Sequence, residues 1–455
     1  MPFESLQDIA NDYEKLLNSN EEYDVIIYAD SDNREIRAHS LVLRTRSQYF
    51  RTAFSKKSFE KKDEKFIFKI PNISFELFNM ILRFIYCGKI DLDRLHESDI
   101  LKLLIAVDEI KIQKLTSYIQ EYLIKNKDGY IQQNTIETLE KIYQNNAFTG
   151  LQNICIKKIC KDPQKLLNPN KFKSLKAPLL ELLLKRDELS LDESVIWDNL
   201  IDWCFAKNPD ISRDPKQWDN DKTKIMERTI HNFISLVRFC HISPENFATK
   251  VFPFKEIMST DLVNDMVQFH MAHQQLIHDK RPPRCYIDSV IINQNHIAVF
   301  SNWIYRKDKF YGHIPYKFNL LYRASRDGNT TGAVHAKCDN KGATLVVIKI
   351  ANSNKIAGGY NPISWDTASG WKSTRDSFIF LFTDRNNLQS AKISYSKGDA
   401  QSIGCHSDKG PTFGWNLNVY MGTWYNDRTN SYQNINDLPQ KFDADDYEVF
   451  QVIKK

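Results

Sequence analysis

The sequence predicts a multidomain α+β protein, with a mixed α/β domain, a helical connector and a β-sandwich-like C-terminal domain that has flanking helices. The length of 455 residues is too great for a single core and corresponds to about three domains at roughly 150 residues each. Of the 15 glycines, 12 lie at or after Gly312, whereas Glu448 is the only glutamate after residue 283. Glutamate favours helices, and glycine favours the turns between strands. We therefore expect a largely helical chain up to residue 283 and a largely β chain after it.

The composition excludes several classes of protein. Hydrophobic residues make up 42% and charged residues 26%, as in globular proteins, which excludes disorder of the whole chain. The net charge of +5 gives no strong case for nucleic acid. The segment after residue 283 is mildly basic, which indicates a solvated surface, with a site for an anionic partner as the alternative. No run of about 18 apolar residues occurs, so no membrane span is expected. The eight cysteines are dispersed and no signal peptide is visible, which predicts reduced thiols in the cytoplasm, with the nucleus as the alternative.

The first 125 residues combine strands and helices. Short β-branched and aromatic runs predict strands at 23–28, 34–38 and 66–70, and Pro71 ends the third. Apolar residues at helical spacing predict helices over 41–54, 75–86 and 101–119.

This segment resembles the BTB (POZ) domain over residues 21–125, after an N-terminal helix at 1–20. The residues that carry the resemblance are Asp24-Val25, Ala38-His39-Ser40-Leu41-Val42-Leu43, Ser47-Gln48-Tyr49-Phe50-Arg51-Thr52-Ala53-Phe54 and Phe84-Ile85-Tyr86-Cys87-Gly88. The resemblance implies homodimerisation and, often, docking to a cullin ubiquitin-ligase scaffold. It also implies that His39 is a structural residue at a strand–helix junction and not a catalytic base.

Cullin-binding BTB domains usually carry a hydrophobic-x-Glu motif after the helix that here ends at Phe54. Glu60 is present, but Ser58 stands two places before it and Phe59 is one place out of register. The cullin-facing surface that the resemblance implies comprises Tyr49, Phe50, Phe54, Phe59 and Glu60.

Residues 126–245 resemble the BACK domain, a helical spacer that follows BTB in many cullin adaptors. The residues that carry this resemblance are Leu189, Glu193-Ser194-Val195 through Trp203, and Ile234-Ser235-Leu236-Val237-Arg238-Phe239. Asp192 is a predicted N-cap, and the polar stretch 208–221 is a predicted loop. A helical linker at 246–283 should end at the two prolines of Arg281-Pro282-Pro283-Arg284.

Three histidines of that linker, His270, His273 and His278, suggest a metal site. No cysteine lies nearby, and no third well-placed ligand is apparent. We therefore expect a solvated helix face and no metal.

The C-terminal segment should form a β-sandwich from strands at 344–350, 378–382, 392–396 and 447–453. It resembles the TLDc domain over 284–455, in which residues 318–328 would form a helix leading into a turn. The elements that carry the resemblance are Phe318–Gly328, Lys349-Ile350, Ile356–Tyr360, Asp376–Phe382, Gly410–Gly414 and Asp446–Phe450.

No catalytic motif occurs in this segment. Gly358-Gly359 belong to no phosphate-binding pattern and are expected between strands, and Gly-x-Ser-x-Gly is absent. If the chain were extended here, His335 and Asp339 would share one face and Cys338 would point away, which disfavours a Cys–His nucleophile.

We expect no binding or catalytic role for the remaining histidines and the tryptophans of this segment. Loop histidines His313 and His406 have no visible partner. The tryptophans that we expect to be core or loop-anchoring are Trp365, Trp371, Trp415 and Trp424. We therefore predict no catalytic, cofactor-binding or metal site.

The sequence thus predicts a non-enzymatic dimeric adaptor that recruits a target of its TLDc domain to a cullin-type ubiquitin ligase. The alternative is a regulator of the oxidative-stress response or of the vacuolar proton ATPase, as TLDc proteins are, that uses BTB only for dimerisation. A hydrolase in the TLDc segment is a third hypothesis and would require a titrating nucleophile. The target of the TLDc domain is not disclosed by the sequence.

Overall fold

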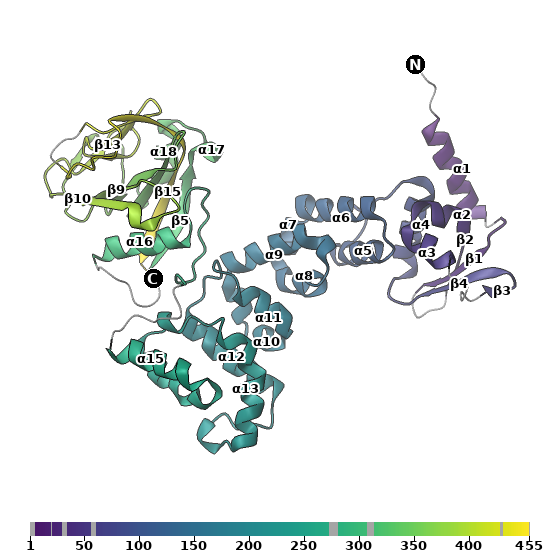
Figure 1. Ribbon diagram of the computed structural model, residues 1–455. Helices are drawn as coiled ribbons and strands as arrows, with labels where there is room; N and C mark the ends of the chain where they lie inside the picture. Colours follow the sequence, from purple (N-terminus) through teal and green to yellow (C-terminus); the bar gives the residue numbers. More distant parts are fainter. Residues whose placement is uncertain are drawn as a thin grey trace. The chain divides into compact units, whose positions relative to one another are not determined.

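The computed structural model describes residues 5–19, 21–29, 34–55, 61–272, 281–306, 314–427 and 431–454 (Figure 1). The chain divides into two compact units, Met1–Ile159 and Cys160–Lys455. Within the part of the chain that the structure describes, no helix is long and apolar enough to cross a membrane.

The N-terminal unit is built on a four-stranded sheet of order β2-β1-β4-β3. Its strands are β1 (Val25–Ala29), β2 (Arg34–Ala38), β3 (Lys61–Lys62) and β4 (Lys65–Ile70). β1 pairs antiparallel with β2 and parallel with β4. Alternate β1 residues, Val25, Ile27 and Ala29, are fully buried, as expected for a strand with one face on the core. The three predicted strands are confirmed.

Helices cover this sheet and extend from it. They are α1 (Leu6–Ser19), α2 (Ser40–Arg46), α3 (Gln48–Phe54), α4 (Phe75–Cys87), α5 (Glu97–Glu109), α6 (Gln113–Asn126), α7 (Asp128–Gln133), α8 (Thr135–Ile142) and α9 (Thr149–Lys161). The Ser74 side chain caps α4, and Gly88 ends it in a left-handed conformation with φ 69°. His39 lies between β2 and α2, with Nδ1 2.8 Å from the Tyr86 hydroxyl and Nε2 2.7 Å from the Glu21 carbonyl oxygen. The structural role predicted for His39 is therefore confirmed.

The second unit begins with a stack of helices. They are α10 (Pro169–Ser174), α11 (Ala177–Leu184), α12 (Glu193–Lys207), α13 (Asn220–Ile234), α14 (Pro244–Asn246) and α15 (Thr260–Ala272). The Asp192 carboxylate accepts a hydrogen bond of 2.8 Å from the Ser194 N–H, which confirms the predicted cap of α12. In the polar stretch 208–221, the Trp218 indole donates a 2.7 Å hydrogen bond to the Ser212 carbonyl, so the loop is anchored.

The C-terminal part is one continuous sheet of eleven strands, ordered β10-β9-β7-β6-β15-β14-β13-β12-β11-β8, with β5 also paired to β15. The strands are β5 (Tyr316–Arg323), β6 (Thr344–Ile350), β7 (Ile356–Asn361), β8 (Gly370–Lys372), β9 (Phe378–Phe382), β10 (Ala391–Tyr395), β11 (Ile403–Cys405), β12 (Thr412–Phe413), β13 (Leu417–Tyr420), β14 (Thr423–Tyr425) and β15 (Lys441–Lys454). The long strand β15 joins the two halves, and its pairing with β6 shifts register between Ala444 and Asp446.

The two halves of this sheet enclose one core, as in a sandwich. Side chains from both halves, such as Ile348 and Leu381 on one side and Leu417 and Trp424 on the other, belong to the same buried cluster. A second cluster, which includes Phe300 of α16 (Gln294–Tyr305), lies on the opposite face of the first half. Figure 1 shows α16 beside this part of the sheet. The predicted β-sandwich-like domain with a flanking helix is confirmed.

Three local expectations for the C-terminal segment are wrong, and the first concerns its first predicted element. Residues 318–328 do not form a helix: they form β5 followed by the short helix α17 (Ala324–Asp327). The buried residues Phe318 and Tyr322 are four apart, a spacing that fits one face of a helix and one face of a strand equally. Pairing with β15, more than a hundred residues away, decides for the strand.

The region around His335 and the glycine pair also differ from expectation. His335 and Cys338 lie in α18 (Thr331–Cys338), not in an extended chain. His335 Nδ1 lies 3.0 Å from the Asp339 carboxylate, because residues four apart lie on the same side of a helix. Cys338 is 1% exposed. Gly358 and Gly359 lie inside β7 and not between strands.

Candidate partner-binding surfaces

The first candidate surface is the outer face of α1. Leu6, Ile9 and Tyr13 are 71%, 53% and 41% exposed, and no residue of this helix is buried. Positions i, i+3 and i+7 lie on one side of a helix, so the three side chains form a continuous apolar stripe. The helix is predicted from the sequence and the stripe is not, although the i, i+3, i+7 spacing of its three residues is visible there.

Polar contacts attach the other side of α1 to the domain. The Glu14 carboxylate lies 2.6 Å from Arg83 and 3.4 Å from Lys89. Burial alone would raise the pKa of Glu14, but these two cations outweigh it and lower the pKa. The helix is therefore held in an orientation that keeps its apolar stripe outward.

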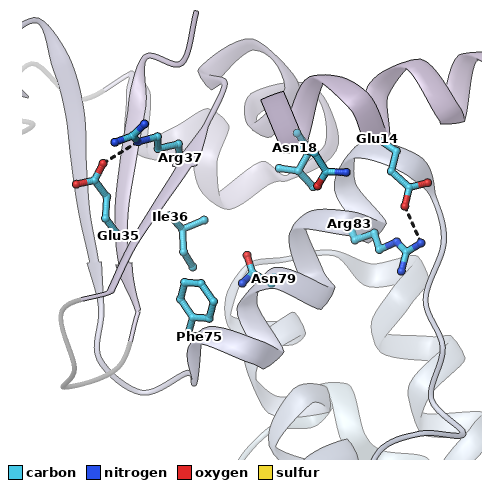
Figure 2. A pocket seen from close by; sticks show the side chains of 9 residues that line it. Glu14, Asn18, Glu35, Ile36, Arg37, Phe75, Asn79 and Arg83 are labelled. Carbon is cyan, nitrogen blue, oxygen red and sulfur yellow. Dashed lines mark hydrogen bonds and ion pairs between the residues drawn. The ribbon is translucent and has the colours of Figure 1, made fainter. Parts of the chain in front are cut away.

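A groove of about 760 Å³ lies between α1, β2 and α4 (Figure 2). Figure 2 shows its charged side chains already joined in pairs, Glu14 with Arg83 and Glu35 with Arg37 at 3.0 Å. Phe75 and Ile36 form its apolar part. The groove is thus electrically balanced by its own residues and does not call for a charged ligand.

The predicted cullin-facing residues fall into three groups. Tyr49 on α3 is 38% exposed, and its ring contacts that of Phe50. Phe50 is fully buried against Phe68, and the half-buried Phe54 contacts both. Phe50 therefore supports the helix from beneath and has no surface to offer a partner. Phe59 and Glu60 lie outside the described residues.

The tryptophans of the C-terminal sheet fall into two groups, one in the core and one half-buried. Trp365 and Trp424 are in the core, as expected. Trp371 and Trp415 are half-buried and touch each other with a centroid distance of 5.3 Å. His406, expected to have no partner, contacts the Trp371 ring at 5.2 Å, so that expectation is wrong. His313 lies outside the described residues.

The described residues contain no group of three or more His, Cys, Asp or Glu side chains placed to hold a metal ion. His270 stacks on Phe247 at 4.4 Å, and His273 and His278 lie outside the described residues. All eight cysteines are buried, and burial raises the pKa of Cys338 to about 12, which keeps that thiol protonated at neutral pH.

Comparison with known proteins decides what kind of modules these are. The family model of the BTB/POZ domain matches residues 13–127, and that of the TLDc domain matches residues 286–453. The chain contains a BTB/POZ domain and a TLDc domain. Among solved structures, the BTB domain of human gigaxonin is similar to this chain with 24% sequence identity. That match has a TM-score of 0.22 and covers 27% of this chain and 96% of that one. No curated protein matches the chain.

BTB and TLDc domains are typically interaction modules without catalytic activity. Their presence in one chain supports a role as a protein-interaction adaptor. In the N-terminal unit, the apolar stripe of α1 and the exposed ring of Tyr49 are then the surfaces to which partners are most naturally assigned.

Proposed function

We propose that the protein is a homodimeric adaptor, in which two BTB domains pair and the two TLDc domains engage a protein target. The observation that carries the proposal is the stripe of Leu6, Ile9 and Tyr13 on α1. Apolar side chains in a row on one helix face gain free energy by burial, and a second copy of the same helix offers a matching stripe about a two-fold axis. Pairing would present two copies of the TLDc domain to a target and raise its apparent affinity.

The proposal keeps the domain division expected from the sequence. It assigns 1–20 to the N-terminal helix, 21–125 to BTB, 126–245 to a BACK-type helical domain, 246–283 to a helical linker and 284–455 to TLDc. The helical stack α10–α15 supports a spacer between the two interaction modules.

The dimer is tested by two single substitutions on one helix. Ile9→Glu places a charge in the apolar stripe, and Ser19→Glu introduces the same charge on an exposed position of the polar face. We expect Ile9→Glu to halve the mass measured by light scattering and Ser19→Glu to leave it unchanged. Equal masses for the two variants would overturn pairing through α1.

We further propose that the dimer docks on a cullin scaffold through the α3 surface, with Tyr49 and Phe54 joined by Phe59 and Glu60. The exposed ring of Tyr49 supports this surface. The double substitution Phe59→Ala, Glu60→Ala should weaken cullin binding without changing the dimer. If the affinity for cullin stays the same, or if the unaltered chain does not bind cullin, the alternative of a stress-response or vacuolar ATPase regulator replaces the ligase adaptor.

A further inference from the structure

A second groove of the BTB domain has an unbalanced charge. It measures about 520 Å³ and lies where α2, α3 and α4 meet the turn between α5 and α6. Its floor is apolar: the half-buried Phe84 has accessible surface, and Ile85 and Ile112, 1% and 6% exposed, lie beneath it. Its charged lining residues are Arg46, Lys111 and Lys114, and no carboxylate is among the described residues that line it.

The three cations have no anionic partner in the described structure. None of them forms an ion pair with a described residue, whereas Arg83, Lys89 and Arg94 of the same domain do. The Arg46 guanidinium instead lies 5.9 Å from the centre of the Phe84 ring.

The nearest acidic residues in the sequence do not neutralise the groove. Asp108 and Glu109 precede Lys111 but do not line it, and the Asp108 carboxylate accepts a 2.6 Å hydrogen bond from Asn145. All three cations are exposed and thus open to a ligand.

The groove beside α1 differs from this groove in its charge balance. There, two carboxylates and two guanidiniums neutralise each other within the groove (Figure 2). Here, three positive charges surround an apolar floor without any internal compensation. Such a surface is complementary to a ligand that carries both negative charge and an apolar group.

We propose that this groove binds an acidic peptide segment of a partner protein. An apolar side chain of the segment would lie on the half-buried Phe84 ring, and flanking carboxylates would lie against Arg46, Lys111 and Lys114. A nucleic-acid strand fits less well, because sequence-tolerant strand binding relies on several exposed aromatic rings in a row, and this groove has one half-buried phenylalanine. The inference goes beyond the proposed dimer and cullin contacts and does not depend on either.

The test uses the full-length chain and a short fluorescein-labelled peptide of glutamates around a central leucine. The double variant Lys111→Glu, Lys114→Glu should lower the affinity at least about tenfold, because it replaces attraction by repulsion at two of three contacts. Binding by the unaltered chain should weaken as salt is added, because the contacts are exposed to solvent. Lys114→Glu alone serves as a second variant, since a glutamate in the first turn of α6 favours the helix and so preserves the fold.

The matched control is Lys69→Glu with Lys157→Glu, two exposed lysines outside the groove that give the same change in net charge. Loss of binding in the groove variants with an unaffected control supports the proposal. Absence of binding by the unaltered chain, or equal losses in groove and control variants, overturns it. The proposal is also overturned if a single-stranded oligonucleotide binds as tightly as the peptide and depends on Lys111 and Lys114 to the same extent. Light scattering of the groove variants keeps the result separate from dimerisation, since their mass should not change.

Discussion

One buried carboxylate, that of Glu193, holds together separate segments of the second unit. Its Oε1 lies 2.7 Å from Nε of Arg284, and its Oε2 accepts a 3.1 Å hydrogen bond from the Arg238 backbone N–H. The Arg284 guanidinium in turn donates to the carbonyl oxygens of Arg186 and Leu236 at 2.6 and 2.7 Å. The side chains of Arg284 and Glu193 are 0% and 3% exposed, and Nε of the buried Arg238 lies 3.9 Å from the same Oε1, so the Arg284 charge depends on this one carboxylate for compensation.

Removing this carboxylate should therefore be costly. We expect Glu193→Ala to lower the free energy of unfolding by about 3–5 kcal/mol, because it leaves a buried, uncompensated arginine. Asp198→Ala is the control: its ion pair with Lys250, at 2.6 Å, is about 40% exposed on each side, and its loss should cost about 1 kcal/mol or less. Denaturant unfolding of the two variants, followed by far-ultraviolet circular dichroism, measures the difference. Equal midpoints would show that the buried pair contributes no more than the exposed one.

A second residue makes stability depend on pH. His296 is 2% exposed in the first turn of α16, and burial lowers its pKa from 6.5 to about 4. Between these two values the unfolded chain binds a proton at this position and the folded chain does not. The neutral, buried His296 therefore makes its full contribution to the free energy of unfolding above pH 6.5. As the pH falls towards 4, the free energy of unfolding decreases by about 3 kcal/mol in total from this residue.

The substitution His296→Gln should flatten this dependence. Glutamine at the third position of a helix can preserve the capping box that His296 makes with Asn293, but it does not titrate. Thermal unfolding of both proteins between pH 7 and pH 4 gives the slope of the thermal midpoint against pH for each. The control is His231→Gln, which replaces an exposed histidine. An unchanged slope in His296→Gln would show that other groups govern acid sensitivity.

At the scale of elements, β7 illustrates why two adjacent glycines lie in a central strand. A Cβ atom on Gly358 would lie 2.0 Å from the Val346 carbonyl oxygen, and one on Gly359 would lie 2.8 Å from the Phe413 ring. Because Gly359 has no side chain, Phe413 from the other half of the sheet can pack closely on this strand, and because Gly358 has none, the neighbouring strand β6 and Phe380 of β9 can approach it.

Gly359→Ala should consequently destabilise the TLDc domain by about 1–3 kcal/mol, the usual cost of overpacking a core. Gly332→Ala is the matched control, because nothing lies within 4 Å of its Cβ position and alanine favours the helix α18. We expect this control to leave stability unchanged or raise it by up to about 1 kcal/mol. Thermal midpoints of the two variants test the prediction, and similar midpoints would contradict it.

These elements also show what a sequence can predict. The strand at 34–38 was predicted to the residue, because a polar turn and a buried partner strand specify it locally. The helix at 318–328 that the TLDc resemblance implies is wrong: the chain there forms β5, and the partner that specifies this strand, β15, is distant in the sequence. The basic groove could not be predicted, because Arg46, Phe84 and Lys111 come from three separate segments that only the fold brings together.

At the scale of the molecule, the two interaction modules occupy different compact units of one chain. The α1 stripe and the basic groove both belong to the BTB-containing unit, and the TLDc domain forms most of the other. This separation leads us to expect that substitutions in α1 change the oligomeric state without unfolding the TLDc sheet.

The most direct test of the adaptor is the mass of the purified chain by light scattering, alone and with a purified cullin N-terminal domain. A dimer of 53.3 kDa chains that gains two cullin domains is the result that we predict. The Ile9→Glu variant should then have the mass of one chain. An unaltered chain that has the mass of a single copy would contradict the account, since neither pairing through α1 nor the joint presentation of two TLDc domains could then occur.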